Sequence, residues 1–281
     1  MNPTVAVIAQ GAMGSAVGRR LVERGIAVTT SLAGRSAASA MRARAADMIA
    51  VSDEEVARAD FFLSIVPPAE ALALAEKMAQ LIARSNRKPI YVDCNAVNPP
   101  TKNEIARVIA KAGCPFVDVG IIGAPPQQGY DGPAFYASGP DAPRLAPLGG
   151  FGLDVRVIAG PIGAASALKM SYAGITKGLT ALSSAMLLAA TRAGAAEALQ
   201  QELARSQPAL LAWFKRAVPN MFPKAYRFVG EMEEIADFVG EDAAARQMFE
   251  AYAALYARLA ADFAGQRDET NALAAFLERK S

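Results

Sequence analysis

The chain has 281 residues, 53% of them hydrophobic, with 29 basic and 27 acidic side chains and no histidine. This length favours two domains with a core each, and the balanced charge excludes the basic footprint that binds a nucleic-acid backbone. Without histidine there is no Ser-His-Asp triad, Cys-His pair or HExxH zinc site, so no metal is expected and acid–base chemistry falls to Lys, Tyr or a carboxylate.

The first half of the chain alternates short β-branched runs with helical stretches, which predicts βαβ units and a parallel sheet. The predicted strands are 4–9, 27–31, 61–66, 89–93 and 116–119. The predicted helices between them are 13–24, 37–46, 69–84 and 101–112. Two later runs, 134–138 and 155–158, are expected to close the sheet as antiparallel edge strands.

After Gly163 the strand signals vanish and Ala/Leu/Glu-rich helical periodicity continues to the C-terminus. The predicted helices are 164–192, 196–206, 209–217, 224–239, 242–265 and 269–280. The first of them contains no proline and, at ~1.5 Å rise per residue, would span on the order of 40 Å, enough to join two domains. The sequence thus predicts an α/β Rossmann domain with a doubly wound sheet over 1–162 and an all-α substrate and dimerisation domain over 163–281.

A glycine-rich turn opens the chain, where the run V-A-V-I-A-Q-G-A-M-G over residues 5–14 passes from strand to helix. It matches the dinucleotide fingerprint, with Ala9 in place of the first glycine. Gly11 lets the backbone approach a pyrophosphate, and Gly14 permits close packing of helix on strand. The predicted cofactor contacts of this turn are Gln10, Gly11, Ala12, Met13 and Gly14. The alternative is a tight connection in a fold that binds no dinucleotide.

The second predicted strand ends without the acid that binds the ribose 2′-hydroxyl of NAD. The chain has Arg35 and Ser36 just beyond it, a guanidinium and a hydroxyl suited to a 2′-phosphate, so NADP is favoured over NAD. The alternative role of Arg35 is that of a solvated loop cation.

Residues 160–172, G-P-I-G-A-A-S-A-L-K-M-S-Y, resemble the catalytic segment of the β-hydroxyacid dehydrogenase family, which includes 3-hydroxyisobutyrate and 6-phosphogluconate dehydrogenases. In that family a G-x-G-x-x-x-K pattern opens the interdomain helix, whereas here Lys169 lies six residues beyond Gly163. Family members often carry Asn three and four residues after the lysine, where this chain has Tyr172 and Ala173. Residues 169–178, K-M-S-Y-A-G-I-T-K-G, look closer to a branch of uncharacterised phosphogluconate-dehydrogenase-like proteins with a divergent helical C-terminal domain, and this resemblance spans nearly the whole chain.

Three other segments agree with this resemblance. Residues 64–68 resemble the family's cofactor loop, and residues 93–99 resemble the segment beside the nicotinamide. Residues 118–124 fall where the family has a D-A-P-V-S-G-G substrate segment, with Ile122 in place of the serine. The resemblance implies cofactor contacts from Val66, Pro67 and Asn95 and substrate contacts from Ile122, Gly123 and Ala124. Asp93 and Asp118, which close buried strands, are interpreted as turn-capping residues, with Asp118 also bracing the cofactor loop.

Hydride transfer between a nicotinamide and a carbonyl needs a group that protonates the developing alkoxide, and we expect Lys169 to do this. Burial at the domain junction near Lys177 is expected to lower the pKa of Lys169 toward neutrality. Tyr172 and Thr176 share a helix face with it and are expected to orient the substrate, with Lys177 to the side. The alternatives are a snorkelling surface lysine and a tyrosine that only fills the core.

Three functions follow from these features. The first is an NADP-dependent dehydrogenase or reductase acting on a small hydroxy acid, an alcohol or the matching carbonyl. The second is an imine reductase of the same superfamily, against which Lys169 argues because those enzymes often replace the lysine. The third is a non-catalytic NADP-binding sensor.

The chain is expected to be a cytoplasmic homodimer that binds neither nucleic acid nor membrane. Residues 1–5 lack a secretory signal, and the apolar stretch 175–190 falls short of the roughly 20 apolar residues that a bilayer needs. Gly174 and Gly178 let another helix approach closely, either from a second copy or from the same chain.

Overall fold

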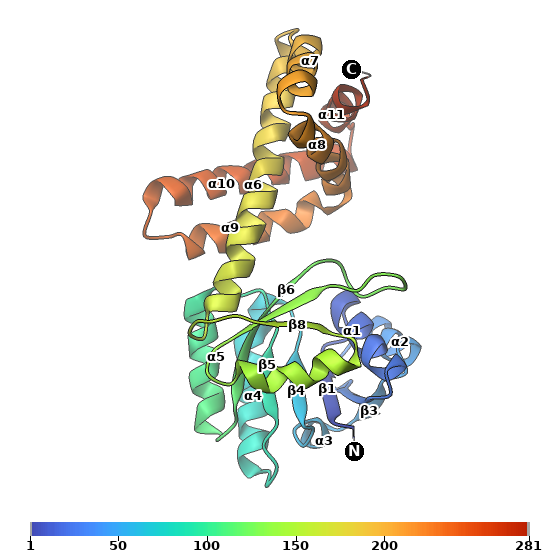
Figure 1. Ribbon diagram of the computed structural model, residues 1–281, viewed down its shortest axis with the longest axis vertical. Coiled ribbons are helices and arrows are strands. Elements are labelled where there is room, and N and C mark those ends of the chain that lie inside the picture. The colour runs from blue at the N-terminus through green and yellow to red at the C-terminus, as the bar shows by residue number, and fades with distance from the viewer. Residues whose placement is uncertain (1, 280–281) are drawn as a thin grey trace. The chain divides into compact units, whose positions relative to one another are not determined.

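An eight-stranded sheet forms the first part of the chain in the computed structural model, which describes residues 2–279 (Figure 1). The strand order is β3-β2-β1-β4-β5-β6-β7-β8, with the first six strands parallel, β7 antiparallel to β6, and β8 parallel to β7. The strands are β1 (Thr4–Ile8), β2 (Ala27–Ser31), β3 (Ile49–Val51), β4 (Phe61–Ser64), β5 (Ile90–Asp93), β6 (Phe116–Ile122), β7 (Ala134–Ser138) and β8 (Asp154–Val157). The reversal of strand order beside β1 creates the crevice where doubly wound sheets bind ligands.

Helices cover both faces of this sheet, and alternating strand residues feed two separate cores. One core joins residues such as Val5 and Val7 to α1 and α2, and the other joins Ala6 and Ile8 to α4 and α5. The helices are α1 (Ala12–Glu23), α2 (Ala37–Ala45), α3 (Asp53–Val56), α4 (Ala71–Arg84) and α5 (Pro99–Lys111), with short 3-10 turns η1 (Pro68–Glu70) and η2 (Ala142–Phe151). This arrangement holds the carboxyl ends of the parallel strands on one edge of the sheet.

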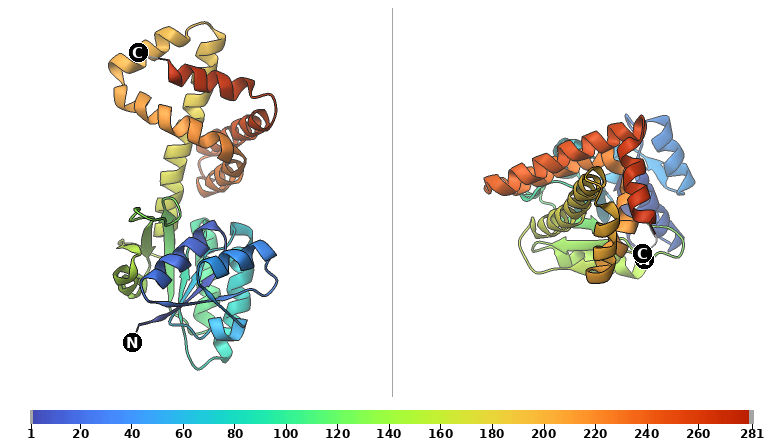
Figure 2. Two further views of the ribbon diagram at one scale, coloured as in Figure 1. Left: turned by 90° about the vertical axis from the view of Figure 1, so that its right-hand side faces the viewer. Right: turned by 90° about the horizontal axis from the view of Figure 1, so that it is seen from above.

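The remainder of the chain is helical (Figure 2). Its elements are α6 (Ala164–Arg192), α7 (Ala196–Ser206), α8 (Pro208–Met221), η3 (Phe222–Lys224), α9 (Ala225–Phe238), α10 (Ala243–Ala264) and α11 (Asp268–Glu278). The chain divides into two compact units between Lys169 and Met170, so the first turns of α6 belong to the first unit. The core of the second unit contains Phe214, Val218, Tyr256 and Phe276, all largely buried.

The predicted fold class, an α/β Rossmann domain followed by an all-α domain, is confirmed. The predicted end of the last helix at Lys280 lies outside the described residues. The elements β3, α3, η2 and η3 were not predicted from the sequence. Pro147 and a glycine pair at 149–150 interrupt any helical periodicity in η2, and β3 has only three residues, two of them exposed.

The small residues of α6 pack against a helix of the same unit. A Cβ on Gly174 would lie 3.1 Å from the ring of Phe249, and one on Gly178 would lie 3.2 Å from the ring of Tyr252, both on α10. Of the two alternatives for these glycines, the described structure therefore shows the intrachain contact.

One helix in residues 2–279, α6, is long and apolar enough by length and composition to cross a membrane. Its most apolar 18-residue window has a mean hydropathy of 1.3, and 44% of that window is buried. A single helix of this kind is a weak indication, because the core helix of a globular protein passes the same test.

Candidate functional site

The glycine-rich turn leaves the first turn of α1 open. Gly11 is the N-cap residue of α1 and no side chain caps the helix there. A Cβ built on Gly11 meets nothing within 4 Å, whereas one on Gly14 would clash with the carbonyl oxygen of Ala9. The two glycines thus have different roles: Gly14 allows α1 to touch the strand, and Gly11 borders free space at the positive end of the helix.

The neighbours of these glycines divide between the interior and the surface. Gln10 is fully buried, and its Nε2 donates to Thr30 Oγ1 and, at 3.1 Å, to the carbonyl of Ser31. The Gln10 side chain therefore ties β1 to β2, and only its backbone faces the turn. Ala12 is exposed and Met13 is half-buried.

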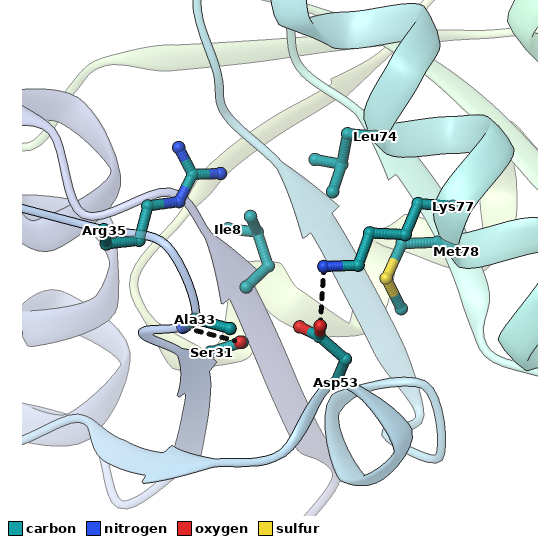
Figure 3. A pocket seen from close by; sticks show the side chains of 8 residues that line it. All are labelled: Ile8, Ser31, Ala33, Arg35, Asp53, Leu74, Lys77 and Met78. Carbon is teal, nitrogen blue, oxygen red and sulfur yellow. Dashed lines mark hydrogen bonds and ion pairs between the residues drawn. The ribbon is translucent and has the colours of Figure 1, made fainter.

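A small pocket lies beside the carboxyl ends of β1 and β2 (Figure 3). Its lining residues are Ile8, Ser31, Ala33, Arg35, Asp53, Leu74, Lys77 and Met78. Arg35 reaches it from the loop after β2, and its Nη1 lies 3.0 Å from Glu70 Oε2. Ser36, by contrast, caps α2 by accepting a hydrogen bond of 3.2 Å from the N–H of Ser39.

Asp53 and Lys77, which were not predicted as site residues, face each other in this pocket (Figure 3). Lys77 Nζ lies 2.6 Å from Asp53 Oδ2. Burial acts to raise the pKa of Asp53, but hydrogen bonds from Lys77 and Ser31 outweigh it and lower that pKa. An acid therefore does reach the end of β2, from the start of α3. Asp53 lies there because it follows β3, and β3 is the neighbour of β2 in the sheet. No spacing of residues along the chain indicated this position of Asp53.

The loop after β4 is braced from inside by Asn95. Its Oδ1 accepts a hydrogen bond of 2.7 Å from the N–H of Val66, and its Nδ2 donates to Ser64 Oγ at 2.8 Å. Asn95 is 1% exposed, so this side chain shapes the loop, while Pro67 is the exposed residue at its rim.

Lys169 lies over β6 in the first unit. A Cβ on Gly120 would lie 2.5 Å from the carbonyl oxygen of Ala165 and 3.2 Å from Lys169 Cβ, so α6 rests directly on the strand at this glycine. The charge of Lys169 also acts on the thiol of Cys94, the residue that follows β5. The contact at Gly120, the fifth residue of β6, places Lys169 on the carboxyl-terminal half of this strand.

The predicted substrate segment at the end of β6 is only partly open. Ile122 is half-buried and pairs with Ala134, and Gly123 and Ala124 are exposed. Gly123 has φ +132°, and a Cβ there would lie 2.5 Å from the hydroxyl oxygen of Tyr130. A side chain at position 123 is excluded by backbone conformation and by space.

The other predicted residues of α6 lie in the second unit. Tyr172 is 52% exposed, and Thr176 Oγ1 donates to the carbonyl of Tyr172 at 2.9 Å. Lys177 Nζ lies 2.7 Å from Glu231 Oε2 and 5.1 Å from the ring centroid of Phe228. Lys177 was expected as a cation that acts on Lys169, but its charge is balanced by this carboxylate.

Among residues 2–279, no group of three or more His, Cys, Asp or Glu side chains is placed to hold a metal ion. The first unit brings together the glycine-rich turn, Arg35, the Val66 loop and Lys169. Tyr172, Thr176 and Lys177 belong to the other unit.

Two family models match the chain. Residues 4–144 match the NAD binding domain of 6-phosphogluconate dehydrogenase, and residues 190–259 match a domain of unknown function, DUF1932. An uncharacterised 28.5 kDa protein of Methanothermus fervidus is 31% identical over 185 residues, which are 66% of this chain and 69% of that protein.

Solved structures resemble nearly the whole chain. MTH1747, a conserved protein of unknown function described as similar to 3-hydroxyacid dehydrogenases, is 28% identical with a TM-score of 0.79, covering 96% of this chain and 99% of its own. The 3-hydroxyisobutyrate dehydrogenase of Mycobacterium tuberculosis, solved with L-serine, is 19% identical with a TM-score of 0.78, covering 98% of this chain and 99% of its own. The second likeness extends to the fold alone.

Proposed function

Because this chain belongs to the family defined by the NAD binding domain of 6-phosphogluconate dehydrogenase, we propose that it is an NADP-dependent oxidoreductase with Lys169 as its general acid and base. The substrate we propose is a small hydroxy acid or alcohol, or the carbonyl compound that corresponds to it. Residues 1–162 would bind the cofactor, and residues 163–281 would serve substrate binding and dimerisation.

The residues of the first unit fit a dinucleotide. The open space at Gly11 and the uncapped N-terminus of α1 suit a pyrophosphate, which accepts hydrogen bonds from backbone N–H groups. The pocket at Arg35 suits the adenosine ribose, with Ser31 and Lys77 as further donors. Val66 and Pro67 would flank the nicotinamide end, since their loop follows the strand next to β1.

When bound, the nicotinamide supplies or accepts the hydride. Lys169 gives a proton from Nζ to the carbonyl oxygen during reduction, and accepts it back during oxidation. Gly120 lets α6 approach β6 closely enough for this side chain to stand at the strand ends. Tyr172, three residues further along α6, orients the substrate oxygen through its hydroxyl, with Thr176 and Lys177 on the turns that follow.

The substrate end of the proposed site is less polar than in the dehydrogenases that the sequence resembles. Ile122 stands where those proteins have a serine, and its half-buried apolar side chain cannot donate a hydrogen bond. The backbone N–H groups of Gly123 and Ala124 remain as donors to an anionic or carbonyl oxygen. A substrate with a short apolar group beside its carbonyl therefore suits this segment best.

The contact of Gly120 with α6 is the observation that carries this proposal, because Lys169 packs there on a strand of the same unit as the glycine-rich turn. The test is NADPH oxidation with a panel of small aldehydes, ketones, keto acids and imines. Turnover with a carbonyl supports the proposal. Turnover with imines alone would assign a C=N reductase, and tight NADPH binding without turnover on any member would assign a sensor.

Cofactor choice is tested at Arg35. We expect Arg35→Ala to weaken NADPH binding about tenfold and to leave NADH binding unchanged, because only NADPH carries the 2′-phosphate that a guanidinium binds as an ion pair. The ion pair with Glu70 is partly exposed and contributes at most about 1 kcal/mol, so a phosphate can displace it. Isothermal titration with each cofactor measures both affinities.

The control for this change is Arg44→Ala, which removes an exposed arginine of α2. Equal losses for NADPH and NADH in Arg35→Ala would contradict the 2′-phosphate assignment. A preference for NADH in the unchanged protein would instead assign Asp53 as the acceptor of a ribose hydroxyl.

We also propose that two copies pair through α6 in the cytoplasm. Ile175, Leu182 and Met186 form a line of exposed apolar side chains along this helix, and Ile175 is 70% exposed. Monomeric proteins rarely leave such a stripe in water. A second copy of α6 is a suitable partner, because a two-fold interface uses the same patch on both chains.

We expect the double variant Ile175→Lys/Leu182→Lys to be a monomer by light scattering after size exclusion, since four lysines would then meet in the pairing surface. The matched control is Tyr226→Lys, which changes a 68% exposed aromatic residue on α9 and should leave the dimer intact. A dimer that persists in the double variant would place the interface elsewhere.

A further inference from the structure

A row of polar side chains crosses four neighbouring strands inside the first unit. The register pairs Ser64 with Asp93, Asp93 with Asp118, and Asp118 with Ser138. All four residues are fully buried, at positions where doubly wound sheets otherwise carry apolar side chains. Burying two carboxylates side by side is costly unless charges and donors compensate them.

Lys102, on α5, supplies the compensating charge. It is fully buried, its Nζ forms an ion pair with the carboxylate of Asp93, and it lies 3.4 Å from Asp118 Oδ1. Burial acts to lower the pKa of Lys102, but the two carboxylates outweigh it and raise that pKa. Lys102 is therefore an ammonium group that holds both acids in the interior.

The carboxylate of Asp118 also accepts hydrogen bonds from residues at the start of α6. Its Oδ2 accepts hydrogen bonds from the N–H of Gly163 at 2.9 Å and of Ser166 at 3.3 Å, and its Oδ1 accepts one from Ser166 Oγ at 2.8 Å. Ser138 Oγ donates to Asp118 at 3.0 Å and accepts from the N–H of Ala165 at 2.9 Å. The first-turn N–H groups of a helix normally bond to a nearby cap or to water. Here residues of two strands, 27 to 48 positions earlier in the chain, satisfy them.

This attachment fixes the helix in two directions. The bonds from Asp118 and Ser138 set the position of its first turn along the axis, and Gly120, two residues after Asp118 on the same strand, sets its distance from the sheet. Lys169 follows Ser166 by three residues, within one turn of the attachment. A Cβ on Gly120 would lie 3.2 Å from Lys169 Cβ, so Lys169 packs on the strand that carries Asp118.

We propose that Asp118, held by Lys102 and linked through Ser138 and Ser166 to the first turn of α6, is the positioning residue for the Lys169 amine. This inference rests on the catalytic role proposed for Lys169, because it assigns the groups that hold that amine in place. Loss of one attachment lets the first turn move, and misplacement of a catalytic group by about 1 Å can cost on the order of a hundredfold in rate.

The test uses Ser138→Ala, Ser166→Ala and Asp118→Asn in the full chain, with Ser183→Ala as control. Ser183 is a buried serine of α6 whose hydroxyl donates to a carbonyl of its own helix, at 2.9 Å from Thr180 O. The first readout needs no substrate: trace acetylation of lysine amines across a pH series, with the peptide containing Lys169 quantified by mass spectrometry and Lys111 as internal reference. The second is NADPH affinity.

We expect the three variants to change the acetylation rate of Lys169 relative to Lys111 by about fivefold or more, most in Asp118→Asn, with NADPH affinity unchanged. Where a substrate is found, kcat should fall by about tenfold to a hundredfold without change in the KM for NADPH. Ser183→Ala should match the unchanged protein.

A Lys169 acetylation profile that stays the same in the folded variants would overturn the proposal. If Asp118→Asn fails to fold, the acetylation profiles of Ser138→Ala and Ser166→Ala test the proposal, because these two variants keep every charged group. If the unchanged protein shows no turnover on the panel, the proposed function fails, yet the acetylation profiles still decide whether Asp118 positions Lys169.

Discussion

Replacement of Lys169 by methionine is expected to lower kcat by about 10²- to 10⁴-fold, the usual contribution of a positioned general acid. Methionine keeps most of the length and apolar volume of the lysine stem, so the packing of α6 over Gly120 should persist. NADPH affinity should stay within about twofold, because the proposed cofactor contacts lie in the turn at Gly11 and the pocket at Arg35. Steady-state kinetics on the best carbonyl of the panel, together with titration of NADPH, measures both quantities.

The matched control is Lys111→Met, which removes an exposed lysine from the last turn of α5 and should leave kcat unchanged. Two results would contradict the assignment of Lys169. One is a kcat that falls by less than about threefold, which is too small for loss of a proton donor. The other is a parallel loss of NADPH affinity and thermal stability, which would show that Lys169 acts through the fold.

The local pattern of apolar residues and prolines was sufficient to predict most of the helices and strands. The helix predicted over 164–192 has the observed bounds, because its sequence contains no proline and carries apolar residues at helical spacing throughout. The strand predicted over 27–31 is likewise observed at those bounds. Where the prediction failed, the local signal was weak: β3 has three residues, and η2 contains an internal proline.

The parts of the site that sequence analysis missed depend on which strands become neighbours. Asp53 reaches the pocket of Arg35 only because β3 lies beside β2, and the chain between Arg35 and Asp53 carries no mark of this. In the sequence, nothing distinguishes Lys102 from an ordinary exposed lysine of the predicted helix 101–112. Its complete burial follows from the register that aligns Asp93 with Asp118 beneath it.

Asp118 illustrates the intermediate case. It was predicted to close a buried strand and to cap a turn. The strand in fact continues to Ile122, and the element that Asp118 caps is α6. The hydrogen bonds that define this role come from residues 163 and 166, too distant in sequence for a turn motif to reveal them.

Substitution of the two glycines of the first turn should affect different properties: Gly14→Ala the stability of the fold, and Gly11→Ala the binding of the cofactor. We expect Gly14→Ala to destabilise the fold by about 3 kcal/mol, because its Cβ would clash with the carbonyl oxygen of Ala9 and the backbone would have to move. For a chain of this size, such a loss lowers the Tm by roughly 6–12 °C. Differential scanning calorimetry without cofactor measures it.

Gly11→Ala should behave in the opposite way. Its Cβ meets nothing within 4 Å and its φ of −73° suits any residue, so the free energy of unfolding should change by less than about 1 kcal/mol. NADPH binding should weaken about a hundredfold or more, because the added methyl group stands where the pyrophosphate must approach the backbone. If Gly11→Ala binds NADPH as the unchanged protein does, the pyrophosphate does not lie on α1, and the proposed orientation of the whole cofactor across the sheet is wrong.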